Sequence, residues 1–251
     1  MTTDEELILR HLADLARTSE RGSYFTFSRF LGLAERSALV SIARELPVPY
    51  TLFGGADEAE RVIARFGSEE ELGYSEPFPV TCLYISPKQE KFADRLTHRD
   101  FLGSILALGI ERDSLGDIIL RNNSAYLFIL SEMADFVARE LTTVKHTAVK
   151  CKVTDELPEG ELYRTERRIV QLNSERLDAT VAKLFSLSRE DGQALVARGL
   201  VFVEGKMVDR PSYTPKAGER ISVRGHGRFI YLGEVSTSRK GKLNIEVDLF
   251  V

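Results

Sequence analysis

Positively charged side chains gather in the last third of the chain. Residues 164–242 contain 16 Lys or Arg against 9 Asp or Glu, whereas residues 1–163 contain 18 against 27. Within the basic stretch, Arg176 and Arg189 each stand near the start of an expected short helix, where amide N–H groups add positive potential. Guanidinium forks suit phosphate oxygens. We therefore expect the two arginines to project from a common edge and to bind a polyanion.

Further basic side chains follow in the same stretch and in the segment after it. The candidates are Lys183, Arg198, Lys206 and Arg228, with Arg239, Lys240 and Lys242 in the turn of a final hairpin. Each single charge is equally consistent with a solvated surface. Taken as a set, they favour polyanion binding.

Two short helices are expected to position these arginines. Apolar residues recur at helical spacing from Leu177 to Leu184, with Ser174 as an expected N-cap residue. Ser188 and Asp191 have the spacing of a capping box, which opens a second helix that ends at Gly199. Short strands and a C-terminal hairpin follow.

The spacing of residues 176–224 resembles that of an S4 (αL) RNA-binding domain. The residues that carry the resemblance are Arg176-Leu177-Asp178, Ser188-Arg189, Leu195-Val196, Gly199, Val201, Val203, Gly205-Lys206, Pro211-Ser212, Gly218, Ile221, Val223 and Arg224. Glu204 stands where this domain usually has Asn. The resemblance implies structured RNA, rather than DNA, as the ligand, and it adds Ser188 to the candidate RNA-binding residues.

Ahead of the basic stretch, the patterns between residues 80 and 153 run strand, helix, strand, strand, helix, strand. This βαββαβ order is typical of a ferredoxin-like (RRM-like) domain, in which two helices cover one face of an antiparallel sheet. Tyr84, Tyr126 and Phe128 are expected on the open face, where aromatic rings can stack on bases. Packing in the core or against another domain is the more common reason for such residues.

The start of the chain, residues 1–75, is expected to form a helix-rich α/β unit. It contains a predicted strand at Tyr50–Phe53, a turn at Gly54 and Gly55, and a predicted helix at Asp57–Phe66. We therefore expect an α+β protein of three small domains. Their ranges are 1–75, 76–160 and, for the S4 domain with its hairpin extension, 165–251.

A second resemblance covers nearly the whole chain. Four segments are similar to the YlmH family of bacterial S4 proteins: residues 54–61 (GGADEAER), 98–103 (HRDFLG), 108–112 (LGIER) and 115–118 (LGDI). The resemblance implies a non-enzymatic factor that binds the large (50S) ribosomal subunit with rRNA or tRNA, in quality control of stalled nascent chains. A link to cell division is also suggested for the family.

Within this second resemblance, Arg99 and Arg112 flank the first helix of the central domain. They either contact RNA or belong to a polar cluster, with Asp100 and Asp117, that fixes the domain packing. The residues alone favour neither interpretation.

Other classes of function find little support in the sequence. No CxxC or HExxH motif and no nucleotide-binding fingerprint is present, so we expect neither a metal nor another cofactor. Cys82 and Cys151 are expected to be buried reduced thiols. No window is long and apolar enough for a membrane span, which makes the cytoplasm the expected location. The alternatives are an RNA-modifying enzyme with an unrecognised site, or a cell-division adaptor that binds protein partners through its acidic front half.

Overall fold

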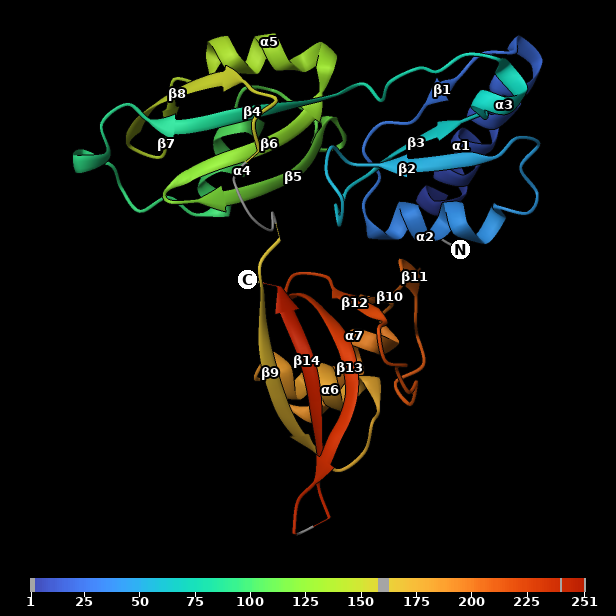
Figure 1. Ribbon diagram of the computed structural model, residues 1–251, viewed down its shortest axis with the longest axis vertical. Helices are drawn as coiled ribbons and strands as arrows, with labels where there is room; N and C mark the ends of the chain where they lie inside the picture. The colour runs from blue at the N-terminus through green and yellow to red at the C-terminus, as the bar shows by residue number, and fades with distance from the viewer. Residues whose placement is uncertain (1–2, 158–162, 240, 251) are drawn as a thin grey trace. The chain divides into compact units, whose positions relative to one another are not determined.

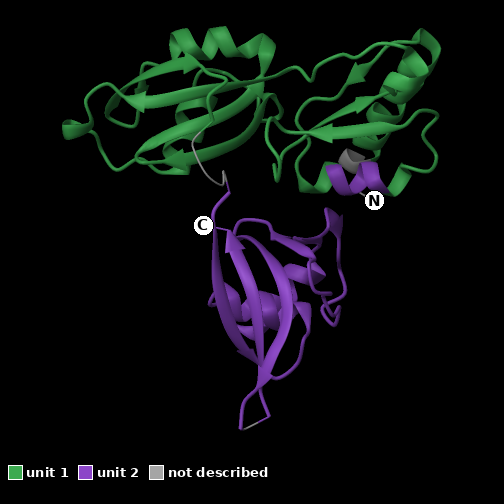
Figure 2. Cartoon of the chain, viewed as in Figure 1, with its two compact units in different colours: residues 1–35, 41–162 green, residues 36–40, 163–251 purple. Residues whose placement is uncertain are grey.

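The structure is a computed structural model that describes residues 3–157, 163–239 and 241–250, so the boundary expected at residue 160 lies outside the described part. The chain forms two compact units: residues 1–35 with 41–162, and residues 36–40 with 163–251 (Figure 1, Figure 2). Apart from residues 36–40, the N-terminal and central parts, expected as separate domains, lie together in the first unit. None of the described helices has the length and apolar character that a membrane crossing requires.

The central part of the first unit has the ferredoxin-like order that the sequence predicts. Its elements are β4 (Val80–Pro87), α4 (His98–Leu106), β5 (Leu115–Arg121), β6 (Ser124–Leu130), α5 (Ser131–Glu140), β7 (Thr143–Val144) and β8 (Thr147–Val153). They form an antiparallel sheet of order β5-β6-β4-β8-β7 (Figure 1). A two-residue turn at Asn122 and Asn123, both with positive φ, joins β5 to β6. The predicted fold class is confirmed, and β7 is an added short edge strand.

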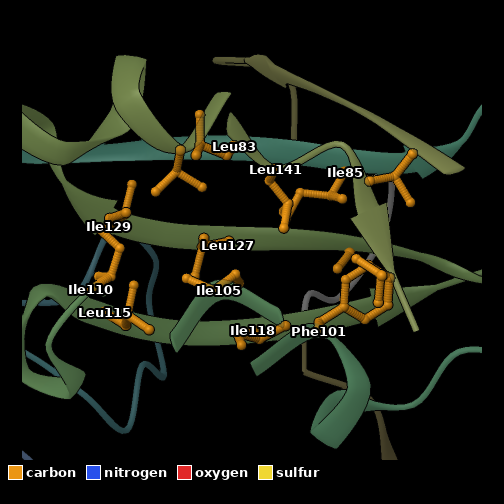
Figure 3. Close-up of a cluster of buried hydrophobic side chains, with 14 of the residues drawn as sticks. Leu83, Ile85, Phe101, Ile105, Ile110, Leu115, Ile118, Leu127, Ile129 and Leu141 are labelled. Carbon is orange, nitrogen blue, oxygen red and sulfur yellow. The ribbon is translucent and has the colours of Figure 1, made fainter. Parts of the chain in front are cut away.

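Helices α4 and α5 cover one face of this sheet, because their apolar stripes meet the inward positions of the strands. Phe101 and Ile105 of α4 and Val137 of α5 are fully buried. They pack against alternate residues of β4 and β6, and Figure 3 shows the cluster that includes Leu83, Ile85, Leu127 and Ile129. The alternation of apolar residues along these strands is what made the fold predictable.

The N-terminal part packs a long helix on a small antiparallel sheet of order β1-β3-β2. Its elements are α1 (Thr3–Gly22), β1 (Thr26–Phe27), α2 (Leu33–Ile42), β2 (Tyr50–Phe53), β3 (Ile63–Phe66) and α3 (Glu69–Leu72). Two side-chain hydroxyls fix α1 to this sheet. Ser19 donates to the Phe66 carbonyl at 3.0 Å, and Thr26 donates to the Leu15 carbonyl at 2.8 Å.

The prediction of a helix at Asp57–Phe66 is wrong, because the second half of this segment forms the strand β3. It pairs with β2 from Tyr50↔Phe66 to Phe53↔Ile63, and with β1 on its other side. The apolar residues in this segment fit a helical spacing, but they also fit a short strand that is buried on both faces. Pairing on both edges decides between the two, and this is a tertiary effect that local propensity does not contain.

Phe128 lies on the sheet face that α4 and α5 leave open, and it is only 2% exposed. Gly55 has a φ of 96°, and a Cβ added there would collide with the Phe128 ring. Gly116 also lies against Phe128, with an added Cβ 3.0 Å from the Phe128 Cβ. Packing within the first unit therefore accounts for Phe128. Tyr84 and Tyr126 remain half-buried, with their ring centroids 4.9 Å apart.

Arg61 ties the N-terminal part to the central part of the first unit. Its Nε donates to the Leu115 carbonyl at 2.7 Å, and its Nη2 donates to the Phe30 and Arg112 carbonyls at 3.1 Å each. Asp117 accepts the backbone N–H groups of Arg61 and of the residue before it, at 3.1 and 2.8 Å. Burial lowers the pKa of Arg61, although nearby carboxylates oppose the shift. The last residue of the GGADEAER segment, Arg61, thus stabilises the packing of the two parts.

The second unit packs two short helices on an antiparallel sheet of order β11-β10-β12-β13-β14-β9. Its elements are β9 (Thr165–Leu172), α6 (Leu177–Leu184), α7 (Arg189–Ala197), β10 (Val201–Val203), β11 (Lys206–Met207), β12 (Arg220–Val223), β13 (Gly227–Thr237) and β14 (Leu243–Phe250). Leu177 and Val181 of α6 and Val196 of α7 are fully buried against the strands. The sequence predicts the C-terminal hairpin that β13 and β14 form, but not strand β9.

Removing the Arg61 side chain is expected to destabilise the protein. Arg61→Ala removes the donor to the Phe30 and Arg112 carbonyls, whereas the Leu115 carbonyl keeps Arg112 as a donor. A buried acceptor left unpaired costs about 1–3 kcal/mol. We expect urea unfolding to show a loss of about 2–4 kcal/mol. Arg10→Ala, at an exposed position of α1, should change the same free energy by less than about 0.5 kcal/mol. Equal effects of the two substitutions would contradict the role given to Arg61.

Candidate nucleic-acid interface

A hollow of about 250 Å³ on the second unit brings three basic side chains together. Lys183 comes from the last turn of α6, Arg189 is the first residue of α7, and Lys242 directly precedes β14. The other wall residues are Gln171, Leu172, Asn173, Ser174, Ala179, Ala182 and Leu187. Lys183 and Arg189 are therefore neighbours on one surface, and the hairpin loop supplies the third cation.

No residue in the wall of this hollow carries a carboxylate. Lys183, Arg189 and Lys242 are all exposed, and within the described residues none of them forms an ion pair. Asn173 and Ser174 add polar side chains to the wall. Such a set of cations suits an anion with several oxygens, such as a phosphate of a nucleic-acid backbone. Lys240, in the same loop as Lys242, lies outside the described residues.

Ser188 fixes the start of α7. Its Oγ accepts the Asp191 N–H at 3.0 Å and donates to an Asp191 carboxylate oxygen at 2.7 Å. The expected N-cap role of Ser188 is confirmed. The cap holds Arg189 at the helix start, where the positive end of the helix dipole adds to its charge. Ser188 therefore positions Arg189, and its own hydroxyl is used within the fold.

Arg176 does not line the hollow. Its Nε and Nη2 donate to the two carboxylate oxygens of Asp178 at 3.0 and 2.7 Å, and the Asp178 side chain is 1% exposed. Burial opposes the charged form of Asp178, but the hydrogen bonds and charge of Arg176 outweigh it and lower its pKa. Two donor groups of Arg176 are thus engaged by a buried acid, and a common edge for Arg176 and Arg189 stays a prediction. Arg176, and not Ser174, is also the N-cap residue of α6.

The other cations proposed on this unit lie apart from the hollow. Arg228 is half-buried between two aromatic rings, with its guanidinium carbon 4.3 Å from the Tyr163 centroid and 4.2 Å from the Phe250 centroid. Arg198 is exposed at the C-terminal end of α7, opposite the end that carries Arg189. Lys206 is exposed on β11, after a tight turn in which Glu204 has a φ of 49°. The Glu204 carboxylate accepts the Arg220 N–H at 2.6 Å, which fixes that turn.

The two arginines proposed on the central part differ in exposure. Arg112 is half-buried and donates to the Leu115 carbonyl at 3.0 Å, and burial, together with the charge of Arg61, lowers its pKa to about 10. Arg99 is exposed on the first turn of α4. Asp100 forms a capping box with Thr97, accepting the Thr97 N–H at 2.8 Å. Arg112 therefore contributes to packing, and Arg99 remains accessible.

The cysteines and carboxylates provide no evident reactive centre in the described part of the chain. Cys82 and Cys151 are free and half-buried, and burial raises the pKa of each thiol to about 12. Both thiols are therefore protonated at neutral pH, where the reactive thiolate is scarce. Among the described residues, no three His, Cys, Asp or Glu side chains are grouped so as to hold a metal ion.

Most of the uncharged wall of the hollow cannot be located from residue spacing alone. Strand β9 pairs with β14, with Leu172 opposite Leu243, and this pairing brings residues 171–174 beside Lys242. The signal that was available is the apolar alternation of Val170 and Leu172, the two buried residues of β9. It is short and is preceded by a charged run, so it does not stand out as a strand.

Two known families match this chain in sequence order. Residues 75–156 match the family described as "Putative RNA-binding domain in YlmH". Residues 175–221 match the S4 domain. The first match covers the ferredoxin-like part, and the second covers α6, α7 and the strands up to the beginning of β12.

Relatives of two kinds are similar in sequence. The "Ribosome-associated protein quality control protein P2" of Bacillus subtilis (strain 168) is 29% identical over 232 residues, which are 90% of this chain and 87% of that protein. The small ribosomal subunit protein uS4 of Thermoanaerobacter sp. (strain X514) is 38% identical over 91 residues, which are 34% of this chain and 44% of that protein. The likeness to uS4 thus spans less than half of the ribosomal protein.

A solved structure supports the fold. The "Cell division protein ylmH from Streptococcus pneumoniae" aligns with a TM-score of 0.50 and 18% identity, over 61% of this chain and 93% of that one. At this identity the likeness shows the fold alone. The chain thus carries a match to the RNA-binding domain described for YlmH followed by a match to the S4 domain, and it is similar along most of its length to the Bacillus subtilis protein.

Proposed function

We propose that this protein is a non-enzymatic factor that binds structured RNA through the hollow on its S4 domain. The observation that carries the proposal is the group of three exposed cations, Lys183, Arg189 and Lys242, in a wall without a carboxylate. Phosphates of a folded RNA are spaced closely enough for one hollow to hold more than one of them. Binding of this kind needs no metal and no nucleotide cofactor.

The ligand of this surface is proposed to be rRNA or tRNA on the large ribosomal subunit. The relative in Bacillus subtilis is named as a ribosome-associated protein of quality control, and it aligns over 90% of this chain. The family matches support RNA as the ligand class, since one is the S4 domain and the other is described as RNA-binding. We infer that the protein acts on stalled nascent chains by holding RNA at the subunit, in the cytoplasm.

Within this surface the basic residues have two different roles. Lys183, Arg189 and Lys242 contact phosphate, because no described carboxylate occupies them. Arg176 is a positioning residue that neutralises Asp178 beneath the start of α6. Arg198 and Lys206 widen the basic surface, and Arg228 holds the C-terminal strand through its two aromatic neighbours.

Reversing the two helix cations is expected to weaken RNA binding and to reduce its salt dependence. In Lys183→Glu/Arg189→Glu, each lost phosphate contact should lower the slope of log K against log[salt] by about 0.7–0.9. Because a hydrogen bond to a charged group is worth about 1.5–3 kcal/mol, we expect affinity for 50S subunits or rRNA fragments to fall at least about tenfold. Fluorescence anisotropy at several salt concentrations measures both quantities.

The matched control for this double variant is Arg210→Glu/Lys216→Glu. It makes the same change in net charge on the same unit, at two exposed residues outside the hollow. It should retain most of the affinity and of the salt slope. Equal losses in the two double variants would mean that net charge alone drives binding, and the hollow would then have no special role. A covalent change in RNA incubated with the protein would contradict the non-enzymatic part of the proposal.

Arg176→Met is expected to reduce stability more than RNA affinity. It leaves Asp178 buried without its counter-charge, so we expect a measurable loss of stability at pH 7. Asp178 has a lowered pKa in the folded protein, so its stabilisation is present above its unfolded pKa and is lost as pH falls through the folded value. Without Arg176, burial raises the pKa of Asp178. At low pH the acid is then protonated, and burying the neutral form costs less free energy than burying the carboxylate.

The stability difference between Arg176→Met and the wild type should therefore be largest at neutral pH and should shrink below about pH 4. Urea unfolding at pH 7 and at pH 3 measures it. Lys183→Met is the control, since Lys183 is exposed and unpaired in the described structure; it should lose RNA affinity and keep its stability. If Arg176→Met instead lost RNA affinity at unchanged stability, Arg176 would be a phosphate ligand.

A further inference from the structure

The most exposed large apolar side chain among the described residues belongs to neither the core nor the S4 hollow. Phe92 is 78% exposed, whereas the other exposed large apolar residues range from 37% to 62%. It ends a short 3-10 helix, Glu90–Phe92, within the loop that joins β4 to α4. Residues 88–97 are called the Phe92 loop below.

The Phe92 loop is fixed at several points, so the ring is presented by a defined backbone. The Lys88 N–H donates to the Ala148 carbonyl at 2.9 Å, at the start of the loop. The Asp94 N–H donates to Thr147 Oγ1 at 2.9 Å. Asn123 accepts the Leu96 N–H at 2.7 Å and donates to the Asp94 carbonyl at 2.9 Å. Both ends of the loop are thus held by the sheet while Phe92 faces solvent.

Basic residues lie in the Phe92 loop itself and on two further segments near Asp100. Lys91 places its Nζ 5.8 Å from the Phe92 ring centroid, and Lys88 and Arg95 are exposed in the same loop. Arg99 on α4 and Lys145 in the β7–β8 turn both lie close enough to Asp100 to lower its pKa, after the hydrogen bonds from Thr97 that contribute most. The five basic residues are Lys88, Lys91, Arg95, Arg99 and Lys145.

The carboxylates near the loop are mostly engaged within the fold. Asp100 accepts two hydrogen bonds from Thr97, at 2.8 and 2.7 Å. Asp94 lies 3.6 Å from the His146 ring and accepts the Thr147 hydroxyl at 3.5 Å. Glu90 remains exposed. An aromatic ring among cations is the combination that binds unpaired nucleotides, because the base stacks on the ring and the phosphates meet the charges.

We propose that the Phe92 loop is a second RNA contact, which stacks one unpaired base on Phe92 and holds the adjoining phosphates with Lys88, Lys91 and Arg95. The inference takes its ligand class from the proposed function, but it uses a different unit and different residues. An open hollow of about 460 Å³, lined by residues 93–96 and Asn123, lies in the same loop and leaves room beside it for a bound strand. The site selects single-stranded rather than paired segments, since only an unpaired base can leave its stack.

The chain contains no Trp, so Phe92→Trp creates a single fluorescent reporter at the proposed contact. We expect the indole emission of this full-length variant to be quenched by a single-stranded RNA of about ten nucleotides, a length within the range that one binding module covers. Phe136→Trp, at an exposed position of α5, is the control and should show no quenching. Absence of quenching in Phe92→Trp at saturating RNA would overturn the proposal.

Affinity measurements give a second readout. Phe92→Ala should weaken binding of the same RNA by about 5- to 150-fold, which is the range for one base–aromatic stack, and should leave the salt slope unchanged. Lys91→Glu/Arg95→Glu should reduce that slope. Phe92→Tyr should restore the affinity. Wild-type affinity in Phe92→Ala, with an unchanged melting temperature, would overturn the proposal.

The two proposals can fail separately. Phe92→Trp is also made in the Lys183→Glu/Arg189→Glu background, where quenching by single-stranded RNA should persist. Quenching that persists while this background binds structured RNA normally would support the Phe92 loop and refute the S4 hollow. Loss of structured-RNA binding without any quenching of the indole would refute the loop and support the hollow. An indole signal that responds only to RNA-free ribosomal proteins would refute RNA as the ligand of the loop.

Discussion

A guanidinium group that is removed from solvent needs hydrogen-bond acceptors or a counter-charge within the fold. This requirement divides the arginines of the protein into those engaged within the fold and those that remain exposed. Arg61 meets it with three backbone carbonyls, and Arg176 meets it with both oxygens of the buried Asp178. Arg228 meets it with two aromatic rings. An arginine whose donors are engaged within the fold in this way is a poor candidate for binding a phosphate. The arginines that stabilise the fold are thus different from the exposed cations of the candidate interface.

The ferredoxin-like part could be predicted because its strands alternate apolar and polar residues and its helices carry one apolar face. Strand β9 is not predicted because only Val170 and Leu172 are buried in it. Its residue Arg167 donates to Asp248 on the neighbouring strand β14 at 2.6 Å. Such cross-strand pairs are non-local, so a single segment does not reveal them. For the same reason β3, which is buried by strands on both edges, resembles a helix when it is taken alone.

The candidate site was predictable to a different degree. The S4-like spacing locates Lys183 and Arg189 because it fixes the register of two helices. It does not say which acid a guanidinium meets, and Arg176, which pairs with the acid two residues later at the start of α6, is the example. Phe92 carries no sequence signal, since its exposure follows from how Asn123 and the Thr147 hydroxyl fix the loop. Exposure of one side chain is a property of the folded chain.

Net charge is a weak guide to where the candidate RNA contacts of this protein lie. The whole chain has a formal charge of -4, and the acidic excess lies in residues 1–163, yet this part carries three exposed cations, Lys88, Lys91 and Arg95, in the Phe92 loop. At physiological ionic strength, charges are screened over about 8 Å, so a bound phosphate responds mainly to its immediate neighbours. The residues close to a site, and not the net charge, therefore determine whether it suits a phosphate. A wall without carboxylates in one unit, and an exposed ring beside cations in the other, are each a local environment suited to a phosphate irrespective of the total charge.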